Sequence, residues 1–224
     1  MRRFLKHNAL SIVFGLMFLG ALGGQAIAGH ADFNDQQVRH GDPTISLGRY
    51  VVSSEYAVDV MENWQSEYLQ FTLYILLTVW LVQRGSPESK EPGKAGRESD
   101  EEQQVGEYAR RSSPKWARVA GIRRTIYENS LVIVMGTIWL GTWFAQSIAG
   151  HAQYNSELLG HQMDTVSWLS YVGKADFWNR TLQNWQSEFL AVGSFAIFAV
   201  YLRQRGSPQS KPVGASHSAT GVEG

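Results

Sequence analysis

The pentapeptide NWQSE at residues 63–67 decides the fold, because it returns letter for letter at residues 184–188. The same shift of 121 residues places the first part of the chain on the second without a gap. Residues 2–90 and residues 123–211 are then identical at roughly 36 of 89 aligned positions, far more than chance gives in an ungapped alignment. The chain is therefore an internal duplication of one unit of about 90 residues.

Each copy carries two apolar blocks. The first block covers residues 10–28, and residues 131–149 in the second copy; each has the length of about 20 residues that a helix needs to cross a bilayer core. The second block, residues 68–82 or 189–202, is shorter, so a helix there crosses only if it also takes in the polar pentapeptide. The pattern predicts an all-α integral membrane protein with four transmembrane helices, arranged as two parallel two-helix repeats.

Composition divides the chain further. Residues 1–90 form the first two-helix repeat, and residues 114–211 form an interfacial helix followed by the second repeat. Residues 91–113 are rich in Glu, Ser and Gly and lack apolar periodicity, which predicts a disordered cytoplasmic linker, and residues 212–224 predict a disordered tail. Between Trp116 and Ile126, apolar residues recur at helical spacing among basic ones, which predicts an amphipathic helix on the inner leaflet.

The distribution of Lys and Arg predicts the orientation. The N-terminus, the middle segment and the C-terminus hold 16 of the 20 basic residues, and the loops at residues 30–63 and 151–184 hold the other four. The basic side is cytoplasmic, so we expect both termini in the cytoplasm and both loops in the periplasm. The start of the chain also has the features of a cleaved secretory leader ending at Ala28. The same features recur at residues 123–150, where no leader exists, so retained spans explain both places.

Polar side chains are predicted at similar depths near the outer membrane boundary. Glu67 and Glu188 lie about one helical turn inside this boundary, where a carboxylate normally needs a partner. Together with Gln and His residues at the end of the preceding spans, they form a candidate intramembrane polar cluster: Gln25, His30, Gln65, Glu67, Gln146, His151, Gln186 and Glu188. The cluster either handles protons or small cations once per copy, or holds the helices together through polar contacts.

Two further sets of residues point to helix packing and membrane depth. Small residues recur at intervals of four along the first span of each copy, which predicts close packing between these spans or between protomers. These residues are Gly20, Gly24, Ala28, Gly141, Ala145 and Ala149. The tryptophans of the pentapeptide, Trp64 and Trp185, are expected to be interfacial anchors.

The motif RGSPxSK closes each copy, at residues 84–90 and 205–211. Its glycine follows the second apolar block and precedes proline by two residues, the pattern of a helix C-cap and stop. The motif also offers groups for lipid headgroup binding or phosphorylation, but capping accounts for its first half.

Several classes of site are excluded or disfavoured. The chain has no Cys, which excludes disulfides, thiolate metal sites and thiol catalysis. His30, His40, His151 and His161 are candidate metal or haem ligands, but none of them lie at close helical spacing, so capping of helix carbonyls is favoured. We expect no cofactor and no bound metal.

No enzyme or nucleic-acid motif is present. The sequence lacks a phosphate-binding loop, a zinc-protease motif and a serine-hydrolase motif. The net charge is zero, and basic residues do not interleave with aromatic ones as in a nucleic-acid groove. We therefore expect a protein that is not an enzyme and binds no nucleic acid.

The twin apolar hairpins, the NWQSE-(Phe/Tyr)-Leu signature and the RGSPxSK ending together resemble a bacterial domain-of-unknown-function family of small tandem-repeat integral membrane proteins. The resemblance covers nearly the whole chain outside the linker and the tail. It implies a bacterial cytoplasmic (inner) membrane protein, and it implies no activity and no catalytic residue.

Three functions stay open at this stage. The first is a non-enzymatic membrane protein that acts through helix association or through small-ion or proton handling. Its partner is the lipid bilayer, and a homo-oligomer is left open. The second is a membrane redox or metal/haem-binding protein that uses the outer histidines. The third is an envelope accessory protein that binds a partner through its periplasmic loops.

Overall fold

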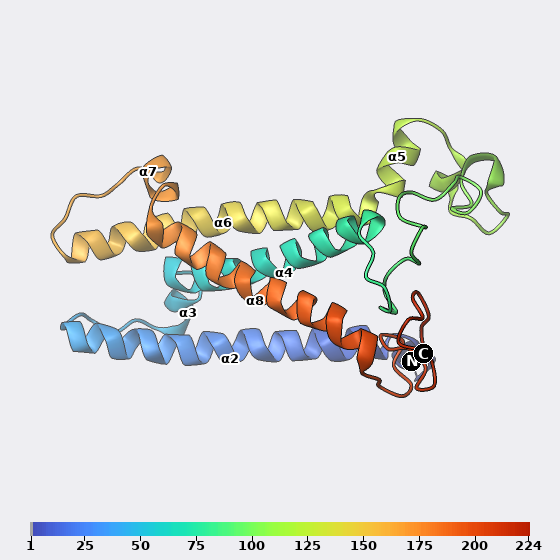
Figure 1. The fold of residues 1–224 in the computed structure, drawn as a ribbon. Helices are drawn as coiled ribbons and strands as arrows, with labels where there is room; N and C mark the ends of the chain where they lie inside the picture. The colour runs from blue at the N-terminus through green and yellow to red at the C-terminus, as the bar shows by residue number, and fades with distance from the viewer. Residues whose placement is uncertain (1) are drawn as a thin grey trace. The chain divides into compact units, whose positions relative to one another are not determined.

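The computed structural model describes residues 2–224, and in this range the protein is all-α (Figure 1). The long helices are α2 (Ala9–His40), α4 (Ser54–Trp80), α6 (Ser130–Gly160) and α8 (Ala175–Tyr201). The short elements are α1 (Arg2–His7), α3 (Leu47–Tyr50), η1 (Gly106–Tyr108), η2 (Lys115–Arg118), α5 (Ile122–Glu128) and α7 (Trp168–Val172). The all-α prediction is confirmed, and the order α2-α3-α4 recurs as α6-α7-α8.

Two helices have the length and composition of membrane spans. The best windows of α2 and α6 have mean hydropathies of 1.9 and 1.5. Helices α4 and α8 do not reach this level, because their first halves carry acidic residues. Each of them still has 27 residues, or about 40 Å of helix at 1.5 Å per residue.

Helices α4 and α8 occupy the same register of the repeat. Both begin nine residues before the pentapeptide, so the helix takes in NWQSE in each copy, as the length argument predicts. Both also end at equivalent positions, Trp80 and Tyr201. The prediction that Gly85 and Gly206 cap these helices is wrong, because the helices end five residues earlier. The two glycines instead take positive φ angles of 88° and 80° in the turn that follows.

The RGSPxSK loops fold alike in both copies. The Ser89 hydroxyl accepts a hydrogen bond from the Gln83 backbone N–H at 2.9 Å, and Ser210 does the same for Gln204 at 2.9 Å. The Lys211 ammonium is buried and donates to backbone carbonyls, including that of His217 at 3.0 Å. Burial lowers the pKa of Lys211, and nearby Arg203 adds to this effect. The second half of the motif therefore holds the loop, which capping alone does not explain.

The predicted interfacial helix is divided in two. Elements η2 and α5 are separated at Gly121, whose φ of 73° breaks the helical path. The rings of Trp116 and Tyr127 still lie 6.4 Å apart across this break. Residues 91–113 form turns and the short η1, and their disorder stays a prediction.

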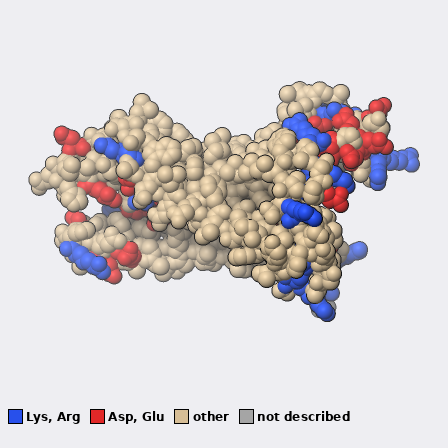
Figure 2. Space-filling view, viewed as in Figure 1, with Lys and Arg blue, Asp and Glu red and all other residues tan. Residues whose placement is uncertain are grey.

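The chain divides into two compact units. The first comprises Met1–Met61 and Gln146–Tyr171, and the second comprises Glu62–Ala145 and Val172–Gly224. In the second unit, α4 and α8 run in the same direction and the first part of α6 runs the opposite way (Figure 1). No residue at 131–156 of α6 or 189–201 of α8 is a Lys, Arg, Asp or Glu. Figure 2 shows a tan surface along the middle of the helices, with charged side chains gathered over the linker and also at the loop ends of the helices.

An aromatic cluster lies at the α6–α8 contact of the second unit, with Phe177 buried within it. The indole ring of Trp143 lies 6.2, 6.1 and 5.6 Å from the rings of Phe177, Trp178 and Trp185. Its N–H points to the hydroxyl of the buried Thr181 at 3.4 Å. These contacts join the two helices of the second repeat, because buried aromatic rings contribute large apolar areas.

In the first unit, a group of hydrogen bonds around residue Ile45 fixes the loop that follows α2. The Ile45 carbonyl accepts from His30 Nε2 at 2.7 Å and from the Asn34 amide at 3.0 Å, and the Ile45 N–H donates to Asn34 Oδ1 at 2.9 Å. A hydrogen on His30 Nε2 suits the Ile45 carbonyl, which only accepts, and the Asn34 amide nitrogen lies 2.9 Å from the same ring nitrogen. The Tyr50 hydroxyl lies directly against Gly29. We call these five residues the loop latch.

The second copy builds the same latch from the residues 121 positions later. The Val166 carbonyl accepts from His151 Nε2 at 2.8 Å and from Asn155 at 3.0 Å, and Val166 N–H donates to Asn155 at 2.9 Å. The Tyr171 hydroxyl lies against Gly150. The histidines therefore fix loops, rather than capping the ends of their own helices. Only His161 follows the capping prediction, through Nδ1 and the Glu157 carbonyl at 2.8 Å.

The latch predicts a steric requirement for glycine at position 29. The substitution Gly29→Ala places a methyl group against the Tyr50 hydroxyl, and Tyr50 is only 3% exposed, so its ring has little room to move. We expect a loss of about 1–3 kcal/mol of stability, and Tyr50→Phe in the same chain should recover part of it. Thermal unfolding in detergent measures both variants.

The control is Gly23→Ala, because a side-chain carbon at Gly23 meets open space. This control should leave stability unchanged or raise it slightly. Equal melting temperatures for the variants at positions 23 and 29 would show that the latch does not constrain the loop.

Candidate functional site

Helices α4 and α8 meet along a polar contact that brings the two pentapeptides together. Three contacts cross it: Glu62–Arg180 at 3.4 Å, Gln65–Trp185 at 2.8 Å and Ser66–Glu188 at 3.3 Å. The residue numbers rise together on both helices, so α4 and α8 are parallel. We call this contact the α4–α8 seam; its residues are Glu62, Gln65, Ser66, Glu67, Asp176, Arg180, Trp185 and Glu188.

Gln65 is the most buried polar side chain of the α4–α8 seam, with 0% exposure. Its Oε1 accepts a hydrogen bond from the indole N–H of Trp185 at 2.8 Å. Its Nε2 has no hydrogen-bond partner among the described residues. A buried N–H group without a partner costs free energy, so this nitrogen is a donor available to a further group.

The α4–α8 seam also contains two carboxylates. Glu188 is half-buried, and its Oε1 accepts a hydrogen bond from the Ser66 hydroxyl at 3.3 Å. Glu67 is exposed on the surface of the chain and interacts electrostatically with Glu188. Two neighbouring carboxylates repel each other when both are charged, and a positive charge placed between them relieves this repulsion.

An ion-pair network closes one end of the α4–α8 seam. The Arg180 guanidinium lies 3.4 Å from Glu62 Oε2 on α4 and 3.6 Å from Asp176 Oδ1 on its own helix. Side chains of both Arg180 and Glu62 are mostly covered, at 26% and 18% exposure. Arg180 thus joins the helices one turn or more before the carboxylate pair.

Only some residues of the predicted polar cluster lie together in one site. Gln65, Glu67 and Glu188 all belong to the α4–α8 seam of the second unit, where Glu67 interacts with Glu188 and Gln65 binds Trp185. Gln186, the repeat counterpart of Gln65, is exposed on the chain. In the first unit, Gln25 is half-buried, and Gln146 is 1% exposed with no hydrogen-bond partner for either amide atom in the described structure. The remaining two members, His30 and His151, serve the loop latches.

Sequence reasoning missed several residues of the α4–α8 seam. Ser66 belongs to the repeated pentapeptide, so its identity in both copies was an available signal. Arg180 and Glu62 had no such signal, because their repeat counterparts are Asp59 and Gln183. Trp185 donates into the α4–α8 seam, a role that the interfacial-anchor prediction for Trp64 and Trp185 did not include.

The glycines of the predicted small-residue stripe have no neighbouring atoms at the positions where a side chain would begin. A side-chain carbon at Gly20, Gly24 or Gly141 meets no atom within 4 Å. Ala28 is exposed, and Ala145 and Ala149 are half-buried. Packing between protomers on this stripe stays a prediction.

The described residues offer no obvious metal centre. Within residues 2–224, no group of three His, Asp or Glu side chains lies close enough together to hold a metal ion. The nearest Nε2 neighbours of His30 and His151 include the loop carbonyls, so these rings have a structural role in the loops.

The burial difference between Gln65 and Gln186 predicts unequal substitution effects. Gln65→Leu leaves the Trp185 indole N–H without its acceptor, and we expect a loss of about 1–3 kcal/mol. Gln186→Leu, at the same position of the other copy, should change stability by about 0.5 kcal/mol or less. Unfolding of the purified protein in detergent compares them. Similar losses for both variants would contradict the asymmetry of the α4–α8 seam.

Comparison with known proteins gives one family. The family described as Domain of unknown function (DUF6766) matches residues 1–222. The comparison with curated proteins and the comparison with solved structures each give no match. The resemblance to a domain-of-unknown-function family is thereby confirmed, and the chain belongs to the DUF6766 family.

Proposed function

We propose that the protein is a non-enzymatic bacterial inner-membrane protein that crosses the bilayer four times and handles protons or a small monovalent cation at Glu67 and Glu188. The observation that carries this proposal is the meeting of the two NWQSE copies in the α4–α8 seam. The repeat supplies one carboxylate from each copy, the Ser66 hydroxyl donates to Glu188, and the Gln65 nitrogen of the same seam has no partner among the described residues.

The four-span topology is supported by helix composition and direction. Helices α2 and α6 are apolar enough to cross, and the second halves of α4 and α8 are uncharged. In two like-oriented hairpins, the second helix of each hairpin must run from the periplasm to the cytoplasm. The parallel course of α4 and α8 agrees with this requirement, as does the excess of basic residues at the termini and in the linker.

A carboxylate pair inside a membrane is suited to single positive charges. Ionised carboxylates are costly in the low dielectric of the bilayer, so a pair exchanges readily between a protonated and a cation-bound form. Ser66 can donate to Glu188 when that group is ionised, and Gln65 Nε2 can donate to a further oxygen. We expect flux to require both carboxylates.

A second candidate function follows from the loop latches. Each latch fixes the backbone of one predicted periplasmic loop through the same three hydrogen bonds. Loops of fixed shape favour recognition of an envelope partner, because less conformational entropy is lost on binding.

Liposomes test the transport proposal directly. Protein reconstituted under a pH or cation gradient should dissipate the gradient, and the double substitution Glu67→Gln with Glu188→Gln should reduce flux to that of empty liposomes. The matched control is Glu157→Gln, which removes an acidic group outside the α4–α8 seam. Wild-type flux in the double variant would rule out the carboxylate pair as the site.

Single cysteines test the topology. Because the chain has no Cys, Ser99→Cys in the linker and Ser156→Cys near the end of α6 can each be labelled without background. Both positions are exposed. An impermeant thiol reagent applied to intact cells, with the outer membrane made permeable, should label position 156 and not position 99. Labelling of position 99, or a mature chain that begins at Gly29, would overturn the four-span topology.

A further inference from the structure

A cavity of about 310 Å³ lies between α4 and α8 in the second unit, beyond the α4–α8 seam. Its volume is at the lower end of the range for small-molecule sites. It is lined by Gln70, Phe71, Tyr74, Glu88, Ala191, Val192, Phe195 and Gln209. We call it the axis cavity.

The lining consists of four pairs related by the repeat. Shifting the first four residues by 121 positions gives the last four: Gln70 with Ala191, Phe71 with Val192, Tyr74 with Phe195 and Glu88 with Gln209. The cavity therefore lies on the local symmetry axis of the duplication. Neither copy alone forms it.

The two copies differ at all four pairs, although the pentapeptide just before them is identical in both. The first copy contributes polar groups through Gln70, Tyr74 and Glu88. The second copy contributes an apolar wall through Val192 and Phe195, with Ala191 leaving space. Phe71 of the first copy and Gln209 of the second depart from this division, so the cavity as a whole has four polar and four apolar lining residues. Such a lining suits an amphipathic ligand.

Among the polar residues of the cavity, the Glu88 carboxylate has no cationic partner in the described part of the chain. The Tyr74 hydroxyl donates to Glu88 Oε2 at 2.5 Å, and Glu88 is half-buried. No Lys or Arg in the described part of the chain forms an ion pair with Glu88. The amide of Gln209 lines the same cavity from the other loop. These groups favour a ligand that brings its own positive charge.

We propose that the axis cavity binds an amphipathic ammonium compound. Its ammonium group binds at Glu88 and the Gln209 amide, and its hydrocarbon part lies against Phe71, Val192 and Phe195. Anionic headgroups are disfavoured by the Glu88 carboxylate. A membrane lipid with an ethanolamine headgroup and a free alkylammonium compound share this chemistry.

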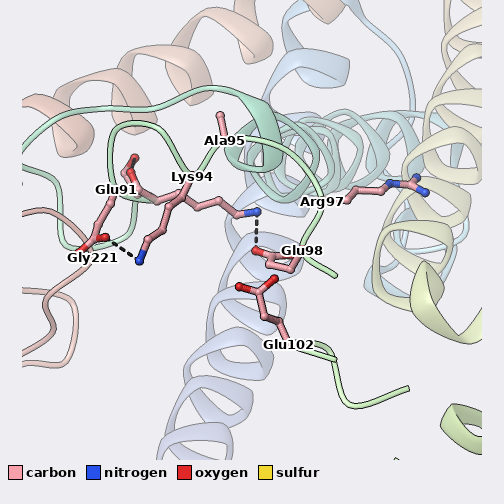
Figure 3. Close-up of a pocket in the computed structure, with 9 residues that line it drawn as sticks. Glu91, Lys94, Ala95, Arg97, Glu98, Glu102 and Gly221 are labelled. Atoms are coloured by element: carbon pink, nitrogen blue, oxygen red, sulfur yellow. Dashed lines mark hydrogen bonds and ion pairs between the residues drawn. The ribbon is translucent and has the colours of Figure 1, made fainter. Parts of the chain in front are cut away.

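The larger hollow in the linker does not compete with this assignment. It has a volume of about 470 Å³ and is lined by residues that neutralise one another, with Lys94 2.8 Å from Glu91 and Lys90 2.5 Å from Glu98. Figure 3 shows these pairs, with the Arg97 side chain pointing away from them. Its charges are therefore already compensated within the chain.

Native mass spectrometry of the full-length protein in detergent tests the proposal. The probes are phosphatidylethanolamine, phosphatidylglycerol and decylammonium. We expect phosphatidylethanolamine to bind at least about tenfold more tightly than phosphatidylglycerol, a ratio that one charge contact readily supplies. Binding of decylammonium as well would identify the ammonium group as sufficient, and binding of the lipid alone would identify the lipid as the source. Equal binding of both lipids, or no binding of any probe, would overturn the proposal.

The symmetry of the axis cavity provides a matched variant. Glu88→Gln should weaken phosphatidylethanolamine binding by about tenfold. Adding Gln209→Glu to this variant moves the carboxylate to the repeat-related position and should restore binding to within about threefold of the wild type. Unchanged binding in Glu88→Gln, or no recovery in a double variant with wild-type melting temperature, would contradict the assignment. Because neither position belongs to the α4–α8 seam, gradient dissipation through Glu67 and Glu188 can succeed or fail independently.

Discussion

The side chain of Gln65, fully buried between α4 and α8, is the contact on which the arrangement of the second unit depends. It receives the indole N–H of Trp185 and so joins the first copy of the pentapeptide to the second. A buried indole N–H without an acceptor would be costly, which fixes both the depth and the rotation of α8 against α4. The contacts of Ser66 with Glu188 and of Glu62 with Arg180 lie along the same faces of these two helices.

This contact also makes two identical sequences unequal. Gln65 is buried and its counterpart Gln186 is exposed on the chain, although five residues around each are the same. An exact symmetric arrangement would give both amides one environment. The two NWQSE segments therefore form an asymmetric pair, in which the first supplies the buried acceptor and the second supplies the donor.

The sequence predicts the helices well and their contacts poorly. The helical continuation of α4 and α8 through NWQSE follows from length alone, since an apolar block of about 15 residues is too short to cross. The predicted helix cap at Gly85 and Gly206 was wrong, because both helices end five residues earlier. The hydroxyls of Ser89 and Ser210 hold the loops that follow, and the two glycines lie in turns of these loops. Partners such as Arg180 and Glu62 could not be found, since a hydropathy pattern contains no information about which helices pack together in space.

Identity and difference between the copies carry separate physical meanings. Where both copies must solve the same local problem, they keep the same residues: His, Asn, Gly and Tyr in each loop latch, and Ser in each RGSPxSK loop. Where the two copies face each other, one ligand contacts equivalent positions of both. Two identical copies would offer the ligand the same groups twice, which suits only a symmetric ligand. At three of the four unlike pairs of the axis cavity the first copy has the more polar residue, and this inequality suits an asymmetric ligand.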